Sequence, residues 1–270
     1  MNLRFGLISD IHLGPPATFG GRLRKLSHQA ETLVQSFVRA AEEARLDLII
    51  NLGDVVEDSS PSEDRERYQR LMDLLAKVGC PVLHVAGNHD CVNLEPQLAK
   101  LWSTPSLYYS YQLDGCSFFV LHSQETKDTA VHLPESQLAW LRGELGRCEY
   151  PAIVLIHHPV SDMNLDGNRW FEQAPHICRV AERRALRKVL EDSGKVVAVI
   201  NGHAHWNHLD LIAGIPYITL QSLIENVEED APGRAAAAWG IGTLDDKVLH
   251  LVVHGEHPVR YQIELPGTRA

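Results

Sequence analysis

The sequence lacks the features of a membrane or secreted protein. No apolar segment approaches the roughly 18 consecutive residues that a membrane-spanning helix requires. The first residues lead directly into a predicted strand that contains Arg4, so no signal peptide is expected. The five cysteines form no CxxC pair and their number is odd, which argues against a disulfide framework. We therefore expect a cytoplasmic protein in a reducing compartment, without a membrane partner.

Positive charge is also scarce. The chain carries 25 basic and 35 acidic side chains, which give a formal net charge of −10. Such a surface repels the phosphate backbone of nucleic acids at long range, and no basic stripe offsets it. We therefore expect no nucleic-acid partner. An anionic small-molecule ligand would need positive charge concentrated locally, which bound metal cations can supply.

Internal repeats and low-complexity linkers are absent too, so we expect one domain over residues 1–270. A hydrophobic content of 44% suffices for a sizeable core. The first half alternates apolar runs with helical patterns such as residues 27–44. Asp114-Gly115 between two apolar runs predicts a hairpin, and the sequence after residue 205 looks all-β. These features suggest two sheets packed face to face, with helices outside.

Residues of metal-binding type follow the apolar runs at five places. An apolar run bounded by Gly or Pro is typical of a buried strand, and α/β folds place their sites beyond the C-terminal ends of parallel strands. One such histidine alone would more simply be a surface or core residue, but five segments at five predicted strand ends favour a metal centre. The segments are Asp10-Ile11-His12, Gly53-Asp54, Gly87-Asn88-His89-Asp90, His157-His158-Pro159 and Gly202-His203-Ala204-His205.

Oxygen and nitrogen ligands without thiolates suit Mn, Fe, Zn or Co better than Ca or a thiolate-seeking metal. Asp10 and His12 lie two apart in an extended segment, so both side chains can point to one side. The carboxylate of Asp54 has two oxygens and can bridge two metal ions. These segments contain seven candidate ligands, which are enough for two divalent or trivalent ions. They are Asp10, His12, Asp54, Asn88, His157, His203 and His205.

Two neighbouring metal ions lower the pKa of a shared water and clamp a phosphoryl group, so hydrolysis of a phosphate ester is the natural reaction. His89 directly follows the candidate ligand Asn88 and cannot easily share its metal. We therefore expect His89 to protonate the leaving group. His158 is expected to face away from the site and to support it from outside.

The five segments resemble the DxH, GD, GNHD, HHP and GHxH motifs of the calcineurin-like binuclear metallophosphoesterase family, in order and over nearly the whole chain. The resemblance implies an α/β fold, a four-layer αββα sandwich of two mixed β-sheets with helices outside. It implies attack on phosphorus by a metal-bound hydroxide, with His89 as the acid that contacts phosphate. It also implies one metal ion on Asp10, His12, Asp54 and His205 and the other on Asp54, Asn88, His157 and His203.

Two branches of the family look similar to this chain. Three segments resemble the class III cyclic nucleotide phosphodiesterases, which implies a small, soluble phosphodiester as substrate: Asp10-Ile11-His12-Leu13, Gly87-Asn88-His89-Asp90 and His157-His158-Pro159-Val160. Residues 196–223 also resemble the manganese-dependent ADP-ribose/CDP-alcohol diphosphatases. The cyclic nucleotide branch commonly has Asp where this chain has His122. A catalytically silent scaffold is a further alternative, but the chain retains every candidate ligand and His89.

Other residues leave alternatives open. Residues 160–175 form either a lid, with Arg169 on phosphate and Trp170 on a base or sugar, or an ordinary solvated loop. His122 is expected to pack or to support the site, and His208 to lie at the surface. For the three basic residues after the first motif, the simpler interpretation is a solvated helix start; they are Arg22, Arg24 and Lys25.

Overall fold

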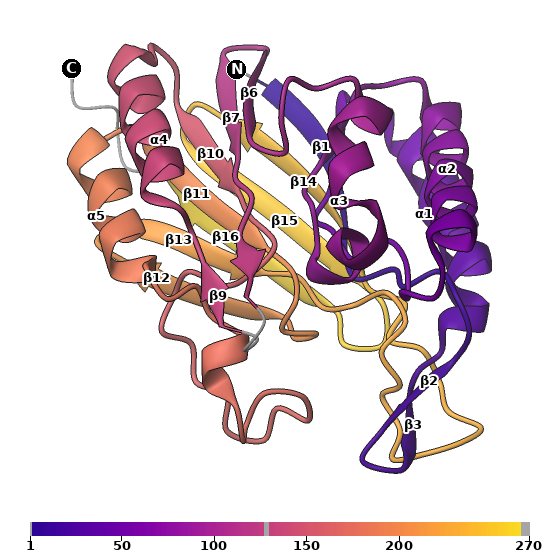
Figure 1. Ribbon diagram of the computed structural model, residues 1–270. Helices are drawn as coiled ribbons and strands as arrows, with labels where there is room; N and C mark the ends of the chain where they lie inside the picture. The colour runs from indigo at the N-terminus through magenta and orange to yellow at the C-terminus, as the bar shows by residue number, and fades with distance from the viewer. Residues whose placement is uncertain (1, 127–129, 266–270) are drawn as a thin grey trace.

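Two mixed six-stranded β-sheets packed face to face form the centre of the structure, a computed structural model that describes residues 2–126 and 130–265 (Figure 1). The first sheet has the strand order β16 (Val259–Glu264), β15 (Val248–His254), β14 (Trp239–Asp245), β1 (Asn2–Ile8), β4 (Leu48–Asn51) and β5 (Val82–His84). The second has the order β12 (His208–Ile212), β13 (Ile215–Thr219), β11 (Val196–Asn201), β10 (Ala152–Leu155), β7 (Cys116–Val120) and β6 (Tyr109–Leu113).

The parallel strands at the centre of each sheet are apolar because the sheets are covered on both faces. In β4, the residues Leu48, Ile49 and Ile50 are all buried. β14 instead alternates buried and more exposed residues, as expected for an antiparallel strand with one wetter face. β1 connects the parallel and the antiparallel part of the first sheet, since it pairs in parallel with β4 and antiparallel with β14. The parallel strands therefore deliver their C-terminal ends to one edge of each sheet.

Apolar side chains from both sheets fill the space between them, and Phe5 and Phe118 are among the largest that are fully buried. Helices pack on the two outer faces, so the expected four-layer αββα sandwich is confirmed (Figure 1). In the described ranges, no helix is long and apolar enough to cross a membrane. The first sheet carries α1 (Ala30–Ala44), α2 (Pro61–Leu75) and α3 (Asn88–Trp102), and the second carries α4 (Glu135–Arg147) and α5 (Arg183–Ser193).

Helix α3 was not expected from the sequence, because Pro96 interrupts its pattern and its first turn reads as a metal motif. The side chain of Asp90 accepts a hydrogen bond of 3.1 Å from the backbone N–H of Gly87, which caps the helix N-terminus. Leu94 and Leu98 are fully buried beneath the helix. A cap and two apolar anchors therefore specify a helix that tolerates an internal proline.

The segment after the first motif also differs from expectation. Residues 22–25 are a strand and not a helix start, because β2 (Ala17–Phe19) and β3 (Arg22–Lys25) form a hairpin whose turn is Gly20-Gly21, both at positive φ. The expected helix over residues 27–44 is present as α1 after a 3₁₀ turn, and Asp114-Gly115 turns the expected β6–β7 hairpin. The remaining short elements are η1 (Ser27–Gln29), η2 (Ala76–Val78), η3 (Pro175–Ile177), and β8 (Gln124–Glu125) paired with β9 (Val131–His132).

Candidate metal centre

The five predicted segments meet at the C-terminal edge of the sandwich. Strands β1, β4 and β5 are neighbours in the first sheet, and β10 and β11 are neighbours in the second, so their last residues converge from both sheets. The structure thus brings together the seven predicted ligands: Asp10 and His12 after β1, Asp54 after β4, Asn88 after β5, His157 after β10, and His203 and His205 after β11.

Five of these seven residues have an unusual backbone conformation. Positive φ is uncommon for residues other than glycine and costs on the order of 1 kcal/mol at each position. Packing alone gives no reason to keep five such residues within one cluster, so the conformation indicates that side-chain direction is being set for a function. The residues and their φ values are Asp10 (50°), His12 (45°), Asp54 (53°), His203 (66°) and His205 (52°).

Two of the motif positions must be glycine because the loops that carry the motifs approach each other closely. A Cβ atom on Gly87 would lie 2.1 Å from the backbone nitrogen of Asp54, and one on Gly202 would lie 2.0 Å from Ser9 Oγ. Asp90 completes the contact, because its Oδ1 accepts a 2.9 Å hydrogen bond from the backbone N–H of Val55. The glycines and Asp90 therefore hold the ligand-bearing loops against each other.

Four of the ligand atoms surround a common point. His12 Nε2 lies 3.3 Å from His205 Nε2 and 3.7 Å from Asp54 Oδ2, and His205 Nε2 lies 3.4 Å from Asp10 Oδ1. Ligands bonded to one tetrahedral ion at about 2.1 Å would lie roughly 3.4 Å from each other. The spacing of this first group therefore fits a bound metal ion.

A second group lies on the other side of Asp54. His157 Nε2 is 3.3 Å from Asp54 Oδ2. Asn88 Oδ1 is buried without a hydrogen-bond partner. Leaving a buried polar atom unpaired costs about 1–3 kcal/mol, which a metal ion at that atom would offset. The ligand atoms of His157, His158 and His203 lie within 4.8 Å of one another, so this group also fits an ion.

Hydrogen bonds on the far side of the rings aim the imidazole nitrogens at the cluster. The Nδ1–H of His157 donates to the carbonyl of Leu52 (2.8 Å), and that of His205 donates to Glu225 (2.7 Å). The Nδ1–H of His12 donates to Glu57 Oε2 (2.9 Å). Each bond fixes the tautomer that leaves Nε2 free for a ligand position. Sequence reasoning missed Glu57 and Glu225, since neither follows a predicted strand.

The electrostatics of the cluster favour a cation within it. Burial and the charge of Lys25 lower the pKa of His12 to about 3, so this imidazole is neutral, as ligation requires. Burial alone would lower the pKa of His157, but the charge of Asp54 raises it to about 10. Likewise, burial alone would lower the pKa of His205, but its hydrogen bonds to Asp10 and Glu225 raise it to about 9. The buried carboxylates thus attract positive charge, which metal ions would supply.

His89 lies next to the predicted ligands, with its ring centroid 4.8 Å from that of His12. Its backbone N–H donates to Asp54 Oδ1 (3.0 Å), and its Nδ1 bonds Asp58 Oδ1. Burial alone would lower the pKa of His89, but the charge of Asp54 and the hydrogen bond to Asp58 raise it. The two carboxylates therefore stabilise positive charge on the His89 ring. Asp58, which orients it, was not singled out from the sequence.

Two expectations about neighbours of the motifs were wrong. His158 does not face away, because its ring centroid lies 4.1 Å from that of His203 and its Nδ1 bonds Ser123 Oγ at 2.7 Å. Lys25 is not a solvated residue at a helix start. It lies in β3 with 4% of its surface exposed, and its Nζ is 3.2 Å from His89 Nε2.

The 160–175 segment contributes one of its two expected residues. Trp170 lies beside the cluster, with its ring centroid 5.5 Å from that of His205 and its Nε1–H bonded to Glu225 (3.0 Å). Arg169 instead bonds the carbonyl of Asn226 (2.8 Å) and Glu229 (3.1 Å), which fastens the segment to residues 226–229. Trp170 therefore lies beside the cluster, whereas the guanidinium of Arg169 is held by residues 226–229.

His122 lines a pocket of about 280 Å³ next to Asn88. Burial lowers the pKa of His122 to about 4, and its Nε2 contacts Cys91 Sγ at 3.6 Å. His208 is partly exposed and pairs with Asp210 at 3.1 Å. His122 thus borders the site as a neutral group, whereas His208 follows the expectation of a residue near the surface.

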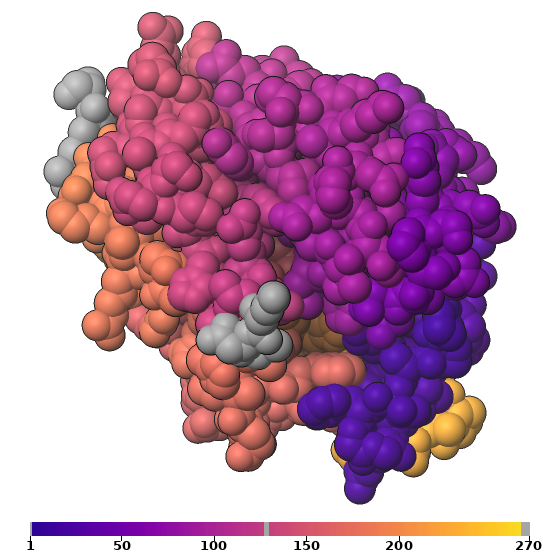
Figure 2. Space-filling view, viewed as in Figure 1, coloured from indigo at the N-terminus to yellow at the C-terminus, as the bar shows by residue number. Residues whose placement is uncertain are grey.

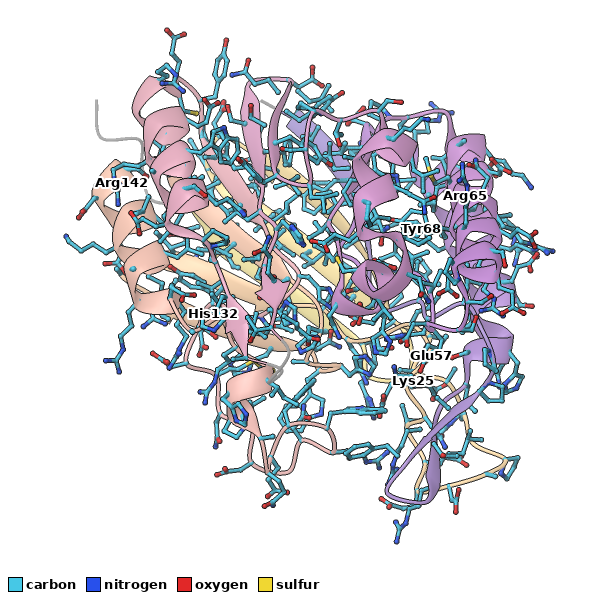
Figure 3. The ribbon with its side chains drawn as sticks, viewed as in Figure 1. Lys25, Glu57, Arg65, Tyr68, His132 and Arg142 are labelled. Carbon is cyan, nitrogen blue, oxygen red and sulfur yellow. The ribbon has the colours of Figure 1, made fainter. Side chains whose placement is uncertain are left out.

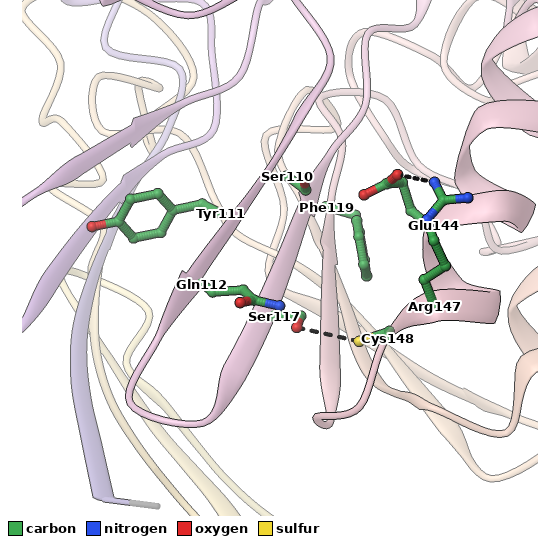
Figure 4. A pocket seen from close by; sticks show the side chains of 8 residues that line it. All are labelled: Ser110, Tyr111, Gln112, Ser117, Phe119, Glu144, Arg147 and Cys148. Carbon is green, nitrogen blue, oxygen red and sulfur yellow. Dashed lines mark hydrogen bonds and ion pairs between the residues drawn. The ribbon is translucent and has the colours of Figure 1, made fainter.

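The molecular surface is hollowed near the cluster. In Figure 2, the β2–β3 hairpin and the 160–180 segment form two protrusions at the lower edge, with a hollow between them. A separate pocket of about 380 Å³ lies between the β6–β7 hairpin and α4, where Glu144 pairs with Arg147 (Figure 4). None of the residues lining that second pocket is a predicted site residue, so the hollow at the sheet edge is the functional candidate.

Known proteins are similar to this chain in sequence or in fold. A probable cyclic nucleotide phosphodiesterase of Synechococcus is 29% identical over 215 residues, which cover 76% of this chain and 74% of that protein. A protein of Haemophilus influenzae described as a 3',5'-cyclic adenosine monophosphate phosphodiesterase is 28% identical over 182 residues, covering 64% and 61%. A solved dimetal phosphatase from Danio rerio shares the fold with a TM-score of 0.78 and 18% identity, covering 98% and 99%.

Residues 3–207 match the family model of the calcineurin-like phosphoesterases, a range that contains all five motif segments. The match spans the strands that carry the cluster in both sheets. The expected class, a metal-dependent phosphoester hydrolase, is confirmed together with the resemblance on which it rested. The chain belongs to the calcineurin-like phosphoesterase family.

Proposed function

We propose that the protein hydrolyses a phosphodiester bond of a small soluble substrate of the cyclic nucleotide kind. The observation that carries the proposal is the convergence of buried ligand atoms around Asp54, with His89 at their edge. The names of the relatives from Synechococcus and Haemophilus influenzae support the substrate class.

The residues that would hold two metal ions are the seven predicted ones. We propose that Asp54 is shared by both ions, since its Oδ2 lies between His12 (3.7 Å) and His157 (3.3 Å). Mn, Fe or Zn fits a ligand set of oxygen and nitrogen atoms. When bound, such ions lower the pKa of a water and neutralise charge on a phosphoryl group. The remaining ligands are Asp10, Asn88, His157, His203, His205 and His12.

His89 would hold the proton that the leaving oxygen takes up. Its Nδ1 is fixed by Asp58, which directs Nε2 towards Lys25 Nζ (3.2 Å) and stabilises the charged ring. Trp170 covers the same region from the other side and would exclude water from it. The proton donor is therefore oriented before substrate arrives.

A substrate panel tests this proposal. With Mn²⁺ added, we expect the highest kcat/KM for a cyclic nucleotide, against ADP-ribose, CDP-alcohols, glycerophosphodiesters and phosphomonoesters. Asn88→Ala is the matched control, because it removes one proposed ligand without adding charge, and it should abolish turnover of every substrate. Preference for ADP-ribose would replace the proposal with a diphosphatase. Absence of metal-dependent turnover on all substrates would leave only a scaffold role.

A further inference from the structure

Lys25 is a buried cation that points into the site from β3. Its Nζ donates to Glu57 Oε2 (2.8 Å) and lies 3.3 Å from His12 Nδ1 and 3.2 Å from His89 Nε2. Figure 3 shows Lys25 next to Glu57, at the end of the sandwich from which the β2–β3 hairpin projects. The hairpin therefore supplies a charged group to the cluster that the five motif segments do not contain.

Lys25 and His89 present neighbouring nitrogen atoms. Lys25 Nζ lies 3.2 Å from His89 Nε2, so a phosphate group that contacts one of these atoms is within reach of the other. An ammonium group has three N–H donors, and Glu57 accepts one of them. A buried charge is costly without charged or hydrogen-bonding partners, and a phosphate oxygen would be such a partner.

The surroundings of Lys25 strengthen its attraction for an anion. Its Nζ lies 5.3 Å from the ring centroid of Trp170, a cation–π contact that also shields the ammonium from water. Phe19 extends this wall, since its ring centroid is 4.8 Å from that of Trp170. Electrostatic interactions are stronger where water is excluded. Two bound metal cations would repel the ammonium group of Lys25. An anionic ligand between the ammonium group and the metal ions would offset that repulsion.

We propose that Lys25 binds a non-bridging oxygen of the substrate's phosphate, next to the oxygen that His89 faces. This inference rests on the proposed function, because it assumes a phosphoester in the hollow. The competing explanation is structural: Lys25 would only hold Glu57 against His12 and so orient a metal ligand. The two explanations differ in their effects, since the first changes phosphate binding and the second changes metal retention.

Substitution of Lys25 separates them. In the full-length protein loaded with Mn²⁺, metal content is measured by mass spectrometry and the affinity for inorganic phosphate by calorimetry. Lys25→Met keeps the length of the side chain and removes its charge. We expect it to retain both metal ions, to bind phosphate about tenfold more weakly or worse, and to raise KM for bis-p-nitrophenyl phosphate more than it lowers kcat. Lys25→Arg should restore part of the phosphate affinity.

Arg22→Ala is the matched control, because it removes a charge from the same strand but from a side chain that pairs with Glu229. It should change phosphate affinity by less than about twofold. Wild-type phosphate affinity in Lys25→Met would overturn the inference. The inference would also fail if Lys25→Met lost a metal ion and excess Mn²⁺ restored its phosphate affinity. If Lys25→Met does not fold, Lys25→Arg decides by the same two measurements. Wild-type protein that hydrolyses no diester would instead refute the proposed function.

Discussion

His12 Nε2 and His205 Nε2 lie 3.3 Å apart, although 193 positions separate the two residues in the chain. Because the Nδ1 atoms are held by Glu57 and Glu225, the two Nε2 atoms are turned towards each other. A metal ion bound there would take the place of any proton on these atoms and accept a lone pair from both rings. This contact, which joins the ends of strands in different sheets, is therefore the feature of the fold that most directly indicates metal binding.

Removal of the central carboxylate should empty the site. We expect Asp54→Ala to lose both metal ions and to lower hydrolysis of bis-p-nitrophenyl phosphate by roughly a hundredfold or more, since Asp54 is shared by both groups of ligands. Metal analysis and initial rates measure this. Asp73→Ala, on the exposed face of α2, should behave like wild type. Wild-type turnover by metal-depleted Asp54→Ala would refute the two-metal proposal.

His89 should matter most for poor leaving groups. We expect His89→Ala to retain its metal ions but to slow hydrolysis, with a larger loss for an alkyl than for a p-nitrophenyl leaving group, because only the alkoxide needs a proton. Asp58→Asn should show a weaker form of the same trend, since Asp58 only orients the ring. A series of diesters with graded leaving groups measures it. An equal loss across the series would rule out the general-acid role.

A single methyl group at Gly87 should disrupt the centre. A Cβ atom there would lie 2.1 Å from Asp54 N and 2.2 Å from Asp54 Oδ1. We expect Gly87→Ala to lower the free energy of unfolding by at least about 3 kcal/mol and to reduce metal content. Gly146→Ala in α4 meets no atom within 4 Å, and it should leave stability unchanged or raise it by up to about 1 kcal/mol. Urea unfolding compares the two; equal stability would contradict the contact.

Buried His84 should make the metal-free protein less stable in acid. Burial lowers the pKa of His84 to about 4, whereas a histidine in an unfolded chain titrates at about 6.5. The unfolded state therefore binds more protons between these values. The stability from neutral His84 is complete above the unfolded pKa and is lost as pH falls towards the folded one.

His84→Phe preserves a ring to stack on Trp102, whose centroid lies 5.6 Å away, but cannot titrate. We expect its unfolding free energy to fall by about 2 kcal/mol less than that of wild type between about pH 7 and pH 5. Urea unfolding at several pH values, with chelator present, measures the difference. Identical slopes for the two proteins would show that His84 is not held neutral.

The predicted ligands were recognisable because they follow apolar strands, and three of the seven come directly after a glycine. Lys25, Glu57, Asp58 and Glu225 were not, because each is a charged residue in a polar segment that looks the same as a solvated loop. Their place is set by contacts between distant segments, as when β3 lies next to the loop after β4.

Some secondary-structure elements could likewise be predicted from the local sequence, and others could not. The Asp114-Gly115 hairpin and α1 follow from local patterns, whereas α3 depends on a cap that the sequence pattern did not reveal. The conformation of Asp90 and Gly87 is fixed by Asp54 and Val55 in another loop. Local sequence therefore specified the strands and their polar ends, and tertiary contacts specified the surrounding charged residues.

The pairing of β1 with β14 has a consequence for synthesis of the chain. Asn2 pairs with Asp245 and Leu7 with Gly240, so β1 gains this neighbour only after every strand of the second sheet has been translated. At roughly 5–20 residues per second, the ribosome takes ten seconds or more to reach that point. During this interval the nascent first sheet has an unpaired apolar edge, which makes it a target for chaperones until residues 239–245 emerge.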